Sequence, residues 1–248
     1  MQYVGRLVSD TMSIIARCGV LLILYWYVFQ LNGGVVNGIT YVVAAWSMFL
    51  YFAFSVLNLR SISRLIMQDV QSGNVELLFN KPVSYFTYRV WWQVGAGLYP
   101  FLIVSIFGTA ILALIIGLPL PALTSLFLFS VLPVFIGASF LTLIVYSLVG
   151  FLAFWIEDVN PIFWIVDKGV MILGGSYLPV ALMPALMYKL ALYSPFGASQ
   201  LLTHTVYNSW QSEWLLAIGI QVFWILVLGL ILYKMYGRAR KKLSVNGG

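Results

Sequence analysis

The chain has 248 residues, of which 62% are hydrophobic and 8% are charged, and its mean hydropathy is +0.98. An ordinary soluble domain carries roughly a quarter charged residues, so this composition excludes a water-soluble fold. The single cysteine, Cys18, and the single histidine, His204, exclude an intrachain disulfide and a metal site built from several cysteines or histidines. The composition is that of a chain whose solvent is a lipid bilayer.

Apolar windows of about 20 residues, the length of a helix that crosses a bilayer, recur along nearly the whole chain. Helices are expected because hydrocarbon offers no partner for free backbone groups. We therefore predict an all-α integral membrane protein, one transmembrane domain over residues 1–248, with six transmembrane helices. The expected spans are about 14–32, 39–57, 94–117, 123–154, 159–176 and 214–233. In the long fourth window we expect tilt or a break near Pro133 and Gly137.

The distribution of Lys and Arg predicts the orientation of these spans. With both termini in the cytoplasm, the inner segments contain 11 of the 13 basic residues. The outer side contains Lys189, and Lys168 falls inside the fifth span. This bias follows the positive-inside rule, and an odd number of spans would remove it. The net charge of +6 is therefore interpreted as orientation in the cell (cytoplasmic) membrane, with membrane lipid and not nucleic acid as its partner.

The longest predicted cytoplasmic loop, residues 58–93, begins with an amphipathic pattern. The apolar side of the helical wheel comprises Leu59, Ile62, Leu65, Ile66 and Val70, and the polar side comprises Arg60, Arg64, Gln68 and Gln71. Gly73 is expected to break this helix. Asn74 then caps a stub helix of about Val75 to Asn80, with Glu76 in its first turn, and Pro82 ends it.

Two interpretations of this loop stay open on the pattern alone. In the first, the helix lies on anionic lipid through Arg60 and Arg64. In the second, the stub helix is a docking element that offers Leu77, Leu78 and Phe79 to the groove of a cytoplasmic protein.

The outer segment 174–200 combines Gly and Pro with apolar pieces of only about ten residues, too short to cross a bilayer. We predict an outer re-entrant helical segment over the mouth of a pathway, because irregular backbone at membrane depth must be covered by protein or line a cavity. A compact outer loop is the alternative. The candidate pathway or gating residues of this segment are Gly174, Gly175, Pro179 and Pro184.

Asp167 and Lys168 are two charged residues inside the fifth predicted span. A charge at the centre of a bilayer costs about 2.5 to 3.5 kcal/mol on insertion scales, so both residues are candidates for substrate or gating contacts. The alternative is a structural role, since Lys168 can extend toward the inner interface.

Chemistry within the chain itself is not expected. Residues 33–40 read GGVVNGIT, which matches the glycines and the final Thr of a phosphate-binding loop, but Ile39 replaces its Lys. Ser and Thr are scattered without a nucleophile motif, and His204 lies in an outer segment. We predict no enzymatic activity and no cofactor in this chain.

Three stretches together resemble the permease subunits of ABC transporters of the type-2 exporter class. They are SGNVELLFNKPVS (72–84), FWIEDVNPIFW (154–164) and GGSYLPVALMPALMYKLALYSPFG (174–197). The number of spans and the basic C-terminal tail are also similar, so the likeness covers the whole chain.

The resemblance implies a permease that pairs with a second copy or a paralogous permease and binds two copies of a separate ATPase subunit, which holds ATP and Mg. It implies that the stub helix is a coupling helix seated in the ATPase, and that a second inner contact lies in the 154–164 stretch. The implied interface residues are Gly73, Glu76, Leu77, Leu78 and Pro82, with Glu157 and Asp158.

From the residues alone, two other function classes stay open. A secondary carrier working without ATP would use Asp167 and Lys168 as coupling groups. A non-transporting membrane scaffold or immunity protein would need neither.

Overall fold

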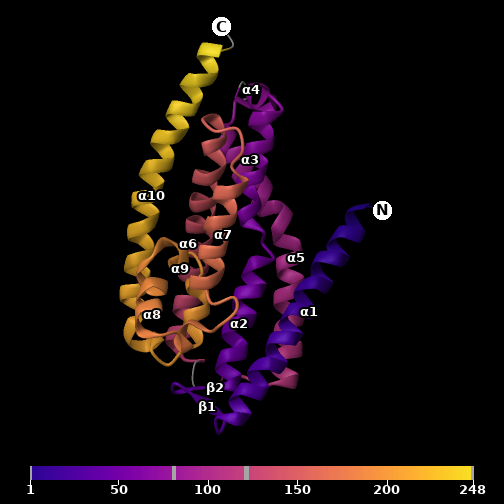
Figure 1. Ribbon diagram of the computed structural model, residues 1–248, viewed down its shortest axis with the longest axis vertical. Helices are drawn as coiled ribbons and strands as arrows, with labels where there is room; N and C mark the ends of the chain where they lie inside the picture. Colours follow the sequence, from indigo (N-terminus) through magenta and orange to yellow (C-terminus); the bar gives the residue numbers. More distant parts are fainter. Residues whose placement is uncertain (1, 80–81, 120–122, 247–248) are drawn as a thin grey trace.

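The computed structural model describes residues 2–79, 82–119 and 123–246, with side chains for 16–79, 82–119 and 123–242. Within these residues the fold is all-α apart from one small hairpin (Figure 1). In chain order, with η for a 3₁₀ turn, the elements are α1 (Gln2–Leu31), β1 (Val35–Val36), β2 (Ile39–Thr40), α2 (Tyr41–Ser55), η1 (Leu59–Ser61), α3 (Ile62–Gln71), α4 (Asn74–Phe79), α5 (Tyr85–Ile115), α6 (Ser125–Phe151), η3 (Leu152–Phe154), α7 (Asn160–Leu173), η4 (Val180–Leu182), α8 (Ala185–Tyr193), α9 (Pro195–Ala198), η5 (Leu201–Val206) and α10 (Trp210–Asn246).

Four helical segments of the described chain are long and apolar enough to cross a membrane. They are Tyr41–Gln71, Tyr85–Ile115, Ser125–Phe154 and Trp210–Lys242. The apolar part of α1, Ala16–Leu31, is shorter. Helix α7 has 14 residues, about 21 Å at 1.5 Å per residue, against roughly 30 Å of hydrocarbon. The expectation of an all-α chain is confirmed, and four of the six predicted spans correspond to helices that could cross a membrane. The first and fifth predicted spans correspond to the apolar part of α1 and to α7, which are shorter.

The segment Tyr41–Gln71 is one span with a bend. Asn58 has a φ of 52°, a left-handed conformation that Asn tolerates better than most residues, and it redirects the chain between α2 and α3. Helix α3 has the expected amphipathic character, but its buried side also includes the polar residues Ser63 and Asp69. It packs closely on α6, because a Cβ on Gly150 would lie 2.9 Å from the backbone of Ser63.

Helix α5 touches this bend with its backbone. A Cβ on Gly97 would lie 2.1 Å from the carbonyl oxygen of Leu57, so the contact requires glycine. Helix α5 begins at Tyr85, well before the expected 94. The predicted loop 58–93 is thus largely helical, and α4 lies at one end of the bundle beside α10, which extends farther (Figure 1).

The fourth predicted span contains no break. Helix α6 runs without interruption through Pro133. Gln221 of α10 packs beside this part of α6, and its Nε2 donates to the carbonyl oxygen of Val134 at 3.4 Å. Gly137 serves this close approach instead of a bend, since a Cβ there would lie 2.2 Å from the Gln221 side chain.

The segment between α7 and α10 runs alongside α10 and turns back. Tyr188 of α8 donates to Glu213 near the start of α10. The carbonyl oxygen of Tyr193, at the end of α8, accepts from Trp224 Nε1 at 2.8 Å. Eleven residues separate these two positions of α10, about 16 Å. The chain then returns through α9 and η5 to Trp210, where α10 begins (Figure 1).

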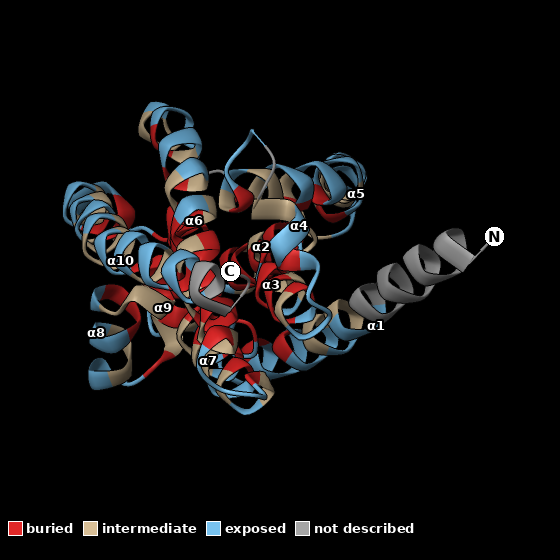
Figure 2. Cartoon of the chain, turned by 90° about the horizontal axis from the view of Figure 1, so that it is seen from above, coloured by how far each residue is buried: buried red, intermediate tan, exposed pale blue. Residues whose placement is uncertain are grey.

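Buried residues gather around α2, α3, α6 and α7, and the outward sides of α5 and α10 are exposed (Figure 2). In the most apolar 18-residue window of α5, 6% of the window is buried inside the protein, and in that of α10 the buried share is 17%. Apolar helix surfaces of this size require a cover of lipid or protein.

Candidate functional site

Helix α4 is built as a separate stub by Gly73. The glycine has a φ of 74°, a conformation in which other residues are strained. It ends α3 and reverses the chain, and Val75 anchors the stub with 1% exposure. The predicted stub of about Val75 to Asn80 is therefore observed as Asn74–Phe79, with Asn80 outside the described residues.

The stub presents fewer apolar side chains than expected. Leu77 is 71% exposed, and Glu76 beside it is also exposed. Leu78 is half-buried. Phe79 stacks on Tyr85 at 5.1 Å and on Tyr236 at 5.6 Å between ring centroids. The expectation that Leu77, Leu78 and Phe79 are all exposed is therefore wrong for the last two, because aromatic rings of α5 and α10 cover this side of α4.

The second predicted inner contact lies at the same end of the molecule. Gln71, at the end of α3, donates from Nε2 to the carbonyl oxygen of Glu157 at 2.9 Å, and Glu157 and Asp158 are both exposed. Asp158 also has a structural task, since its Oδ1 accepts from the backbone N of Asn160 at 2.9 Å at the start of α7. Pro82 is exposed in the connection to α5.

A buried ion pair that the sequence reasoning missed joins the helices on either side of α4. Asp69 of α3 accepts from Tyr85 Oη at 2.7 Å and from Arg89 Nε at 2.6 Å, and a second guanidinium nitrogen of Arg89 completes a bidentate pair. The side chains are 7% exposed for Asp69 and 14% for Arg89. We call Asp69, Tyr85 and Arg89 the α4 clamp, because they tie α3 to the start of α5.

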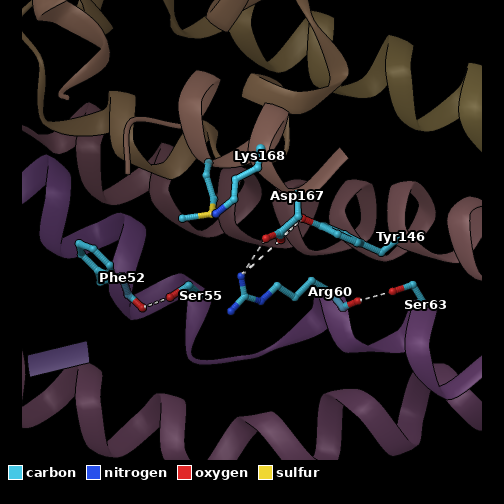
Figure 3. Close-up of polar contacts among 8 residues, drawn as sticks. Phe52, Ser55, Arg60, Ser63, Tyr146, Asp167 and Lys168 are labelled. Atoms are coloured by element: carbon cyan, nitrogen blue, oxygen red, sulfur yellow. Dashed lines mark hydrogen bonds and ion pairs between the residues drawn. The ribbon is translucent and has the colours of Figure 1, made fainter. Parts of the chain in front are cut away.

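A second buried carboxylate has the same kinds of partners. Asp167 of α7 accepts from Tyr146 Oη at 2.8 Å and from Arg60 Nη1 at 3.3 Å (Figure 3). The Asp167 side chain is 3% exposed, whereas that of Arg60 is 45% exposed. We call Asp167, Tyr146 and Arg60 the α7 cluster. It pairs an arginine with the carboxylate that the sequence analysis expected inside the fifth span.

Lys168 does not belong to this cluster. Its Nζ lies 3.8 Å from the sulfur of Met171 and 5.8 Å from the ring of Trp164, and it is exposed on the surface of α7. The two adjacent charges thus point in different directions, as the helical geometry required. Adjacent residues of a helix were expected to diverge in this way, and their separate partners agree with that expectation.

The Gly and Pro residues of the outer segment shape its backbone. Gly174 is buried, and a Cβ there would lie 2.5 Å from Gln200. Gly175 has a φ of 85°. Pro179 and Pro184 precede η4 and α8 as their N-caps. None of these residues lines the apolar hollow between α6 and α10 or the one beside Tyr193.

His204 is buried in η5, and its Nε2 has no hydrogen-bond partner among the described residues. Burial lowers its pKa from 6.5 to about 4, because the charged ring would lose its hydration. It is therefore neutral at pH 7. The described residues contain no group of three His, Cys, Asp or Glu side chains that could hold a metal ion.

Comparison with models of protein families, with curated proteins and with solved structures finds no match for this chain.

Proposed function

We propose that the chain is the permease subunit of an ATP-driven transporter of the ABC type-2 class, an exporter whose substrate movement is coupled to ATP hydrolysis by a separate ATPase subunit. The observation that carries the proposal is α4, a six-residue helix that projects at one end of the bundle and exposes Leu77. A short helix with one exposed leucine and an acidic neighbour suits the groove of a soluble partner. The exposed loop that contains Glu157 lies next to the end of α3 and would add to the surface that α4 offers to this partner.

The charges support a six-span topology with both termini in the cytoplasm. In α10, Glu213 and Lys234 bracket 20 uncharged residues, about 30 Å of helix, which equals the thickness of the hydrocarbon. Arg60 is the first charge after the start of α2 at Tyr41, 19 residues earlier or about 28 Å. Both distances put the inner border of the hydrocarbon near Arg60 and Lys234.

On the same scale, the outer segment would be re-entrant. Tyr188 pairs with Glu213 at the outer border, and Tyr193 reaches the level of Trp224, near the middle of the 20 uncharged residues. The chain returns to the outer border at Trp210. Helix α7, which is too short to cross alone, would cross together with this segment.

In the proposed mechanism, closure of the ATPase pair displaces α4. Because the α4 clamp joins α3 to α5, the displacement would move both helices together. The bend at Asn58 separates α3 from α2, so the inner half of this span can tilt with less effect on its outer half. Such tilting would alternate access to a path between two permease subunits.

A second permease, identical or paralogous, is the partner that we propose within the membrane. The exposed sides of α5 and α10 are long enough to pack against another set of helices. Two ATPase subunits, which bind ATP and Mg, would then dock on two copies of α4.

An ion-driven secondary carrier is the alternative that a specific observation favours. Asp167 is a buried carboxylate in a short helix, as in many proton-coupled sites. Its pairing with Arg60 and Tyr146 argues against it, because the carboxylate would have to give up these partners to bind a coupling ion.

Leu77→Glu tests the docking role. The affinity-tagged full chain is purified from membranes of its own host, and co-purified ATPase activity is measured. Because Leu77 is exposed, the variant is expected to insert normally and to lose most of that activity, at least tenfold. Leu118→Glu, at an exposed leucine beyond the far end of α5, is the matched control and should keep it.

Equal ATPase recovery from Leu77→Glu and wild type would contradict the docking role. A labelling experiment tests the orientation independently. A cysteine placed at Asn74 in a Cys18→Ser background should react only after the membrane is opened. Reaction from outside intact cells would contradict the topology.

A further inference from the structure

Cations of α3 and α7 gather on one exposed face. The Arg64 guanidinium lies 4.4 Å from the ring centroid of Phe163 and 5.4 Å from that of Trp164. Lys168 approaches Trp164 to 5.8 Å. Arg60 lies one turn before Arg64 on the same side of the chain, and 45% of its side chain is exposed. We call Arg60, Arg64, Trp164 and Lys168 the basic face.

The basic face carries uncompensated charge. Asp167 is the carboxylate within reach, and it is already bound by Arg60 and Tyr146. Among the described side chains, neither Arg64 nor Lys168 has a carboxylate within 4.0 Å. Three cations against one carboxylate leave an excess of two positive charges where two helices meet.

The depth of this face is set by neighbouring contacts. A Cβ on Gly229 of α10 would lie 3.9 Å from the side chain of Ile144 in α6. Tyr146, which binds Asp167, follows Ile144 by two residues, and Lys234 follows Gly229 by five. Tyr146 therefore lies about three residues of helix, or about 5 Å, less far along the helix direction than Lys234. The α7 cluster and the basic face therefore lie within one turn of the border that Lys234 marks.

Apolar surface continues from the basic face toward the centre of the bilayer. Ile172, four residues after Lys168 on the same stripe of α7, is 45% exposed. The face has cations at the membrane border, an exposed indole ring between them and an apolar surface on the side toward the bilayer centre. This order matches the headgroup, interface and acyl chain of a lipid.

We propose that the basic face is a binding site for one anionic phospholipid, whose phosphate is held by Arg64 and Lys168 and whose acyl chain lies along Ile172. Arg60 contributes its outward N–H groups while it keeps Asp167. An arginine held flat on aromatic rings is partly dehydrated and presents its remaining donors in a fixed direction, which suits a phosphate. The proposal needs a membrane protein with this border, and it does not depend on a partner ATPase.

The test measures lipid binding by the full chain in dodecyl maltoside micelles with native mass spectrometry. Dioleoyl phosphatidylglycerol, dioleoyl phosphatidylcholine and inorganic phosphate are titrated separately. Wild type should retain one phosphatidylglycerol at concentrations at which phosphatidylcholine and phosphate are lost. The double variant Arg64→Gln with Lys168→Gln leaves the pair of Arg60 and Asp167 intact, and its affinity for that one lipid should be about 30-fold lower.

The matched control, Lys234→Gln with Arg238→Gln, removes the same charge from α10 and should change the affinity less than about threefold. An equal loss in the two double variants would overturn the site in favour of diffuse attraction. Equal retention of phosphatidylcholine, or stoichiometric binding of inorganic phosphate, would overturn the anionic lipid as its ligand. If the double variant unfolds, Lys168→Gln alone should lower the affinity about fivefold, and an unchanged affinity would refute the proposal.

Discussion

The α4 clamp and the α7 cluster are built from the same three residue types and differ in how firmly they hold. Both have a buried aspartate that accepts from a tyrosine and an arginine. In the clamp, Arg89 is 14% exposed and binds Asp69 through two nitrogens. In the cluster, Arg60 is 45% exposed, and one nitrogen lies 3.3 and 3.4 Å from the two oxygens of Asp167.

This difference separates a fixed joint from an adjustable one. A bidentate, short and shielded pair keeps its geometry because solvent cannot compete for either partner. A long contact from a half-exposed arginine can be exchanged for water or for another anion at modest cost. The firm pair lies next to the proposed docking helix, and the loose one lies beside the basic face.

Removing Arg89 should have the largest effect. Arg89→Gln leaves Asp69 buried with Tyr85 as its remaining side-chain partner, so the free energy of unfolding should fall by about 3 to 5 kcal/mol. Unfolding by sodium dodecyl sulfate in mixed micelles measures it. The exposed Arg64→Gln serves as the control and should change it by less than about 0.5 kcal/mol. A similar small change for Arg89→Gln would show that the clamp is not a firm joint.

Burial of His204 should make the free energy of unfolding depend on pH. The pKa of His204 is about 4 in the folded chain and 6.5 when it is exposed. Between pH 6.5 and 4 the unfolded chain therefore binds a proton that the folded chain does not, and stability falls as the pH decreases. This loss reaches about 3 kcal/mol at pH 4. His204→Gln should remove it from the pH profile of unfolding, and a profile that keeps its slope in this window would contradict the burial of a neutral histidine.

Removing Arg60 should cost less than removing Arg89. Arg60→Gln takes away a half-exposed, long contact, and Tyr146 still donates to Asp167, so we expect a loss of about 2 kcal/mol. The same unfolding titration compares the two variants directly. If Arg60→Gln proves as destabilising as Arg89→Gln, the α7 cluster is a second firm joint. The exposure of Arg60 would then not make its contact with Asp167 easier to exchange.

Local features were predictable where the residue types themselves dictate the backbone. Gly73 followed by Asn74 and Glu76 indicated the stub helix to within one residue at its start. The amphipathic spacing indicated α3, and the apolar windows indicated the long helices. Of the tilt or break expected near Pro133, the break is absent, since α6 continues through it. The contact of Gln221 with the same part of α6 joins residues 87 apart, and spacing along the chain contains no such information.

Pairings between distant residues were not predictable for the same reason. Asp69 and Arg89 are 20 residues apart and Arg60 and Asp167 are 107 apart, so no helical spacing links them. The one signal was the position of Asp69 at the border of an amphipathic helix, where a buried acid needs a cation. Phe79 was expected to be exposed because no residue near it in the sequence indicates that it stacks on Tyr236.

The backbone contact of Gly97 with Leu57 has a mechanical consequence for α5. With no side chain between the two backbones, α5 can pivot there more easily than it can separate. Tyr85 lies 12 residues to one side of the pivot and Ile115 lies 18 residues to the other, which gives arms of about 18 and 27 Å. Pushed at its short arm, α5 would act as a lever whose far end swings in the opposite direction through a distance about one and a half times as large.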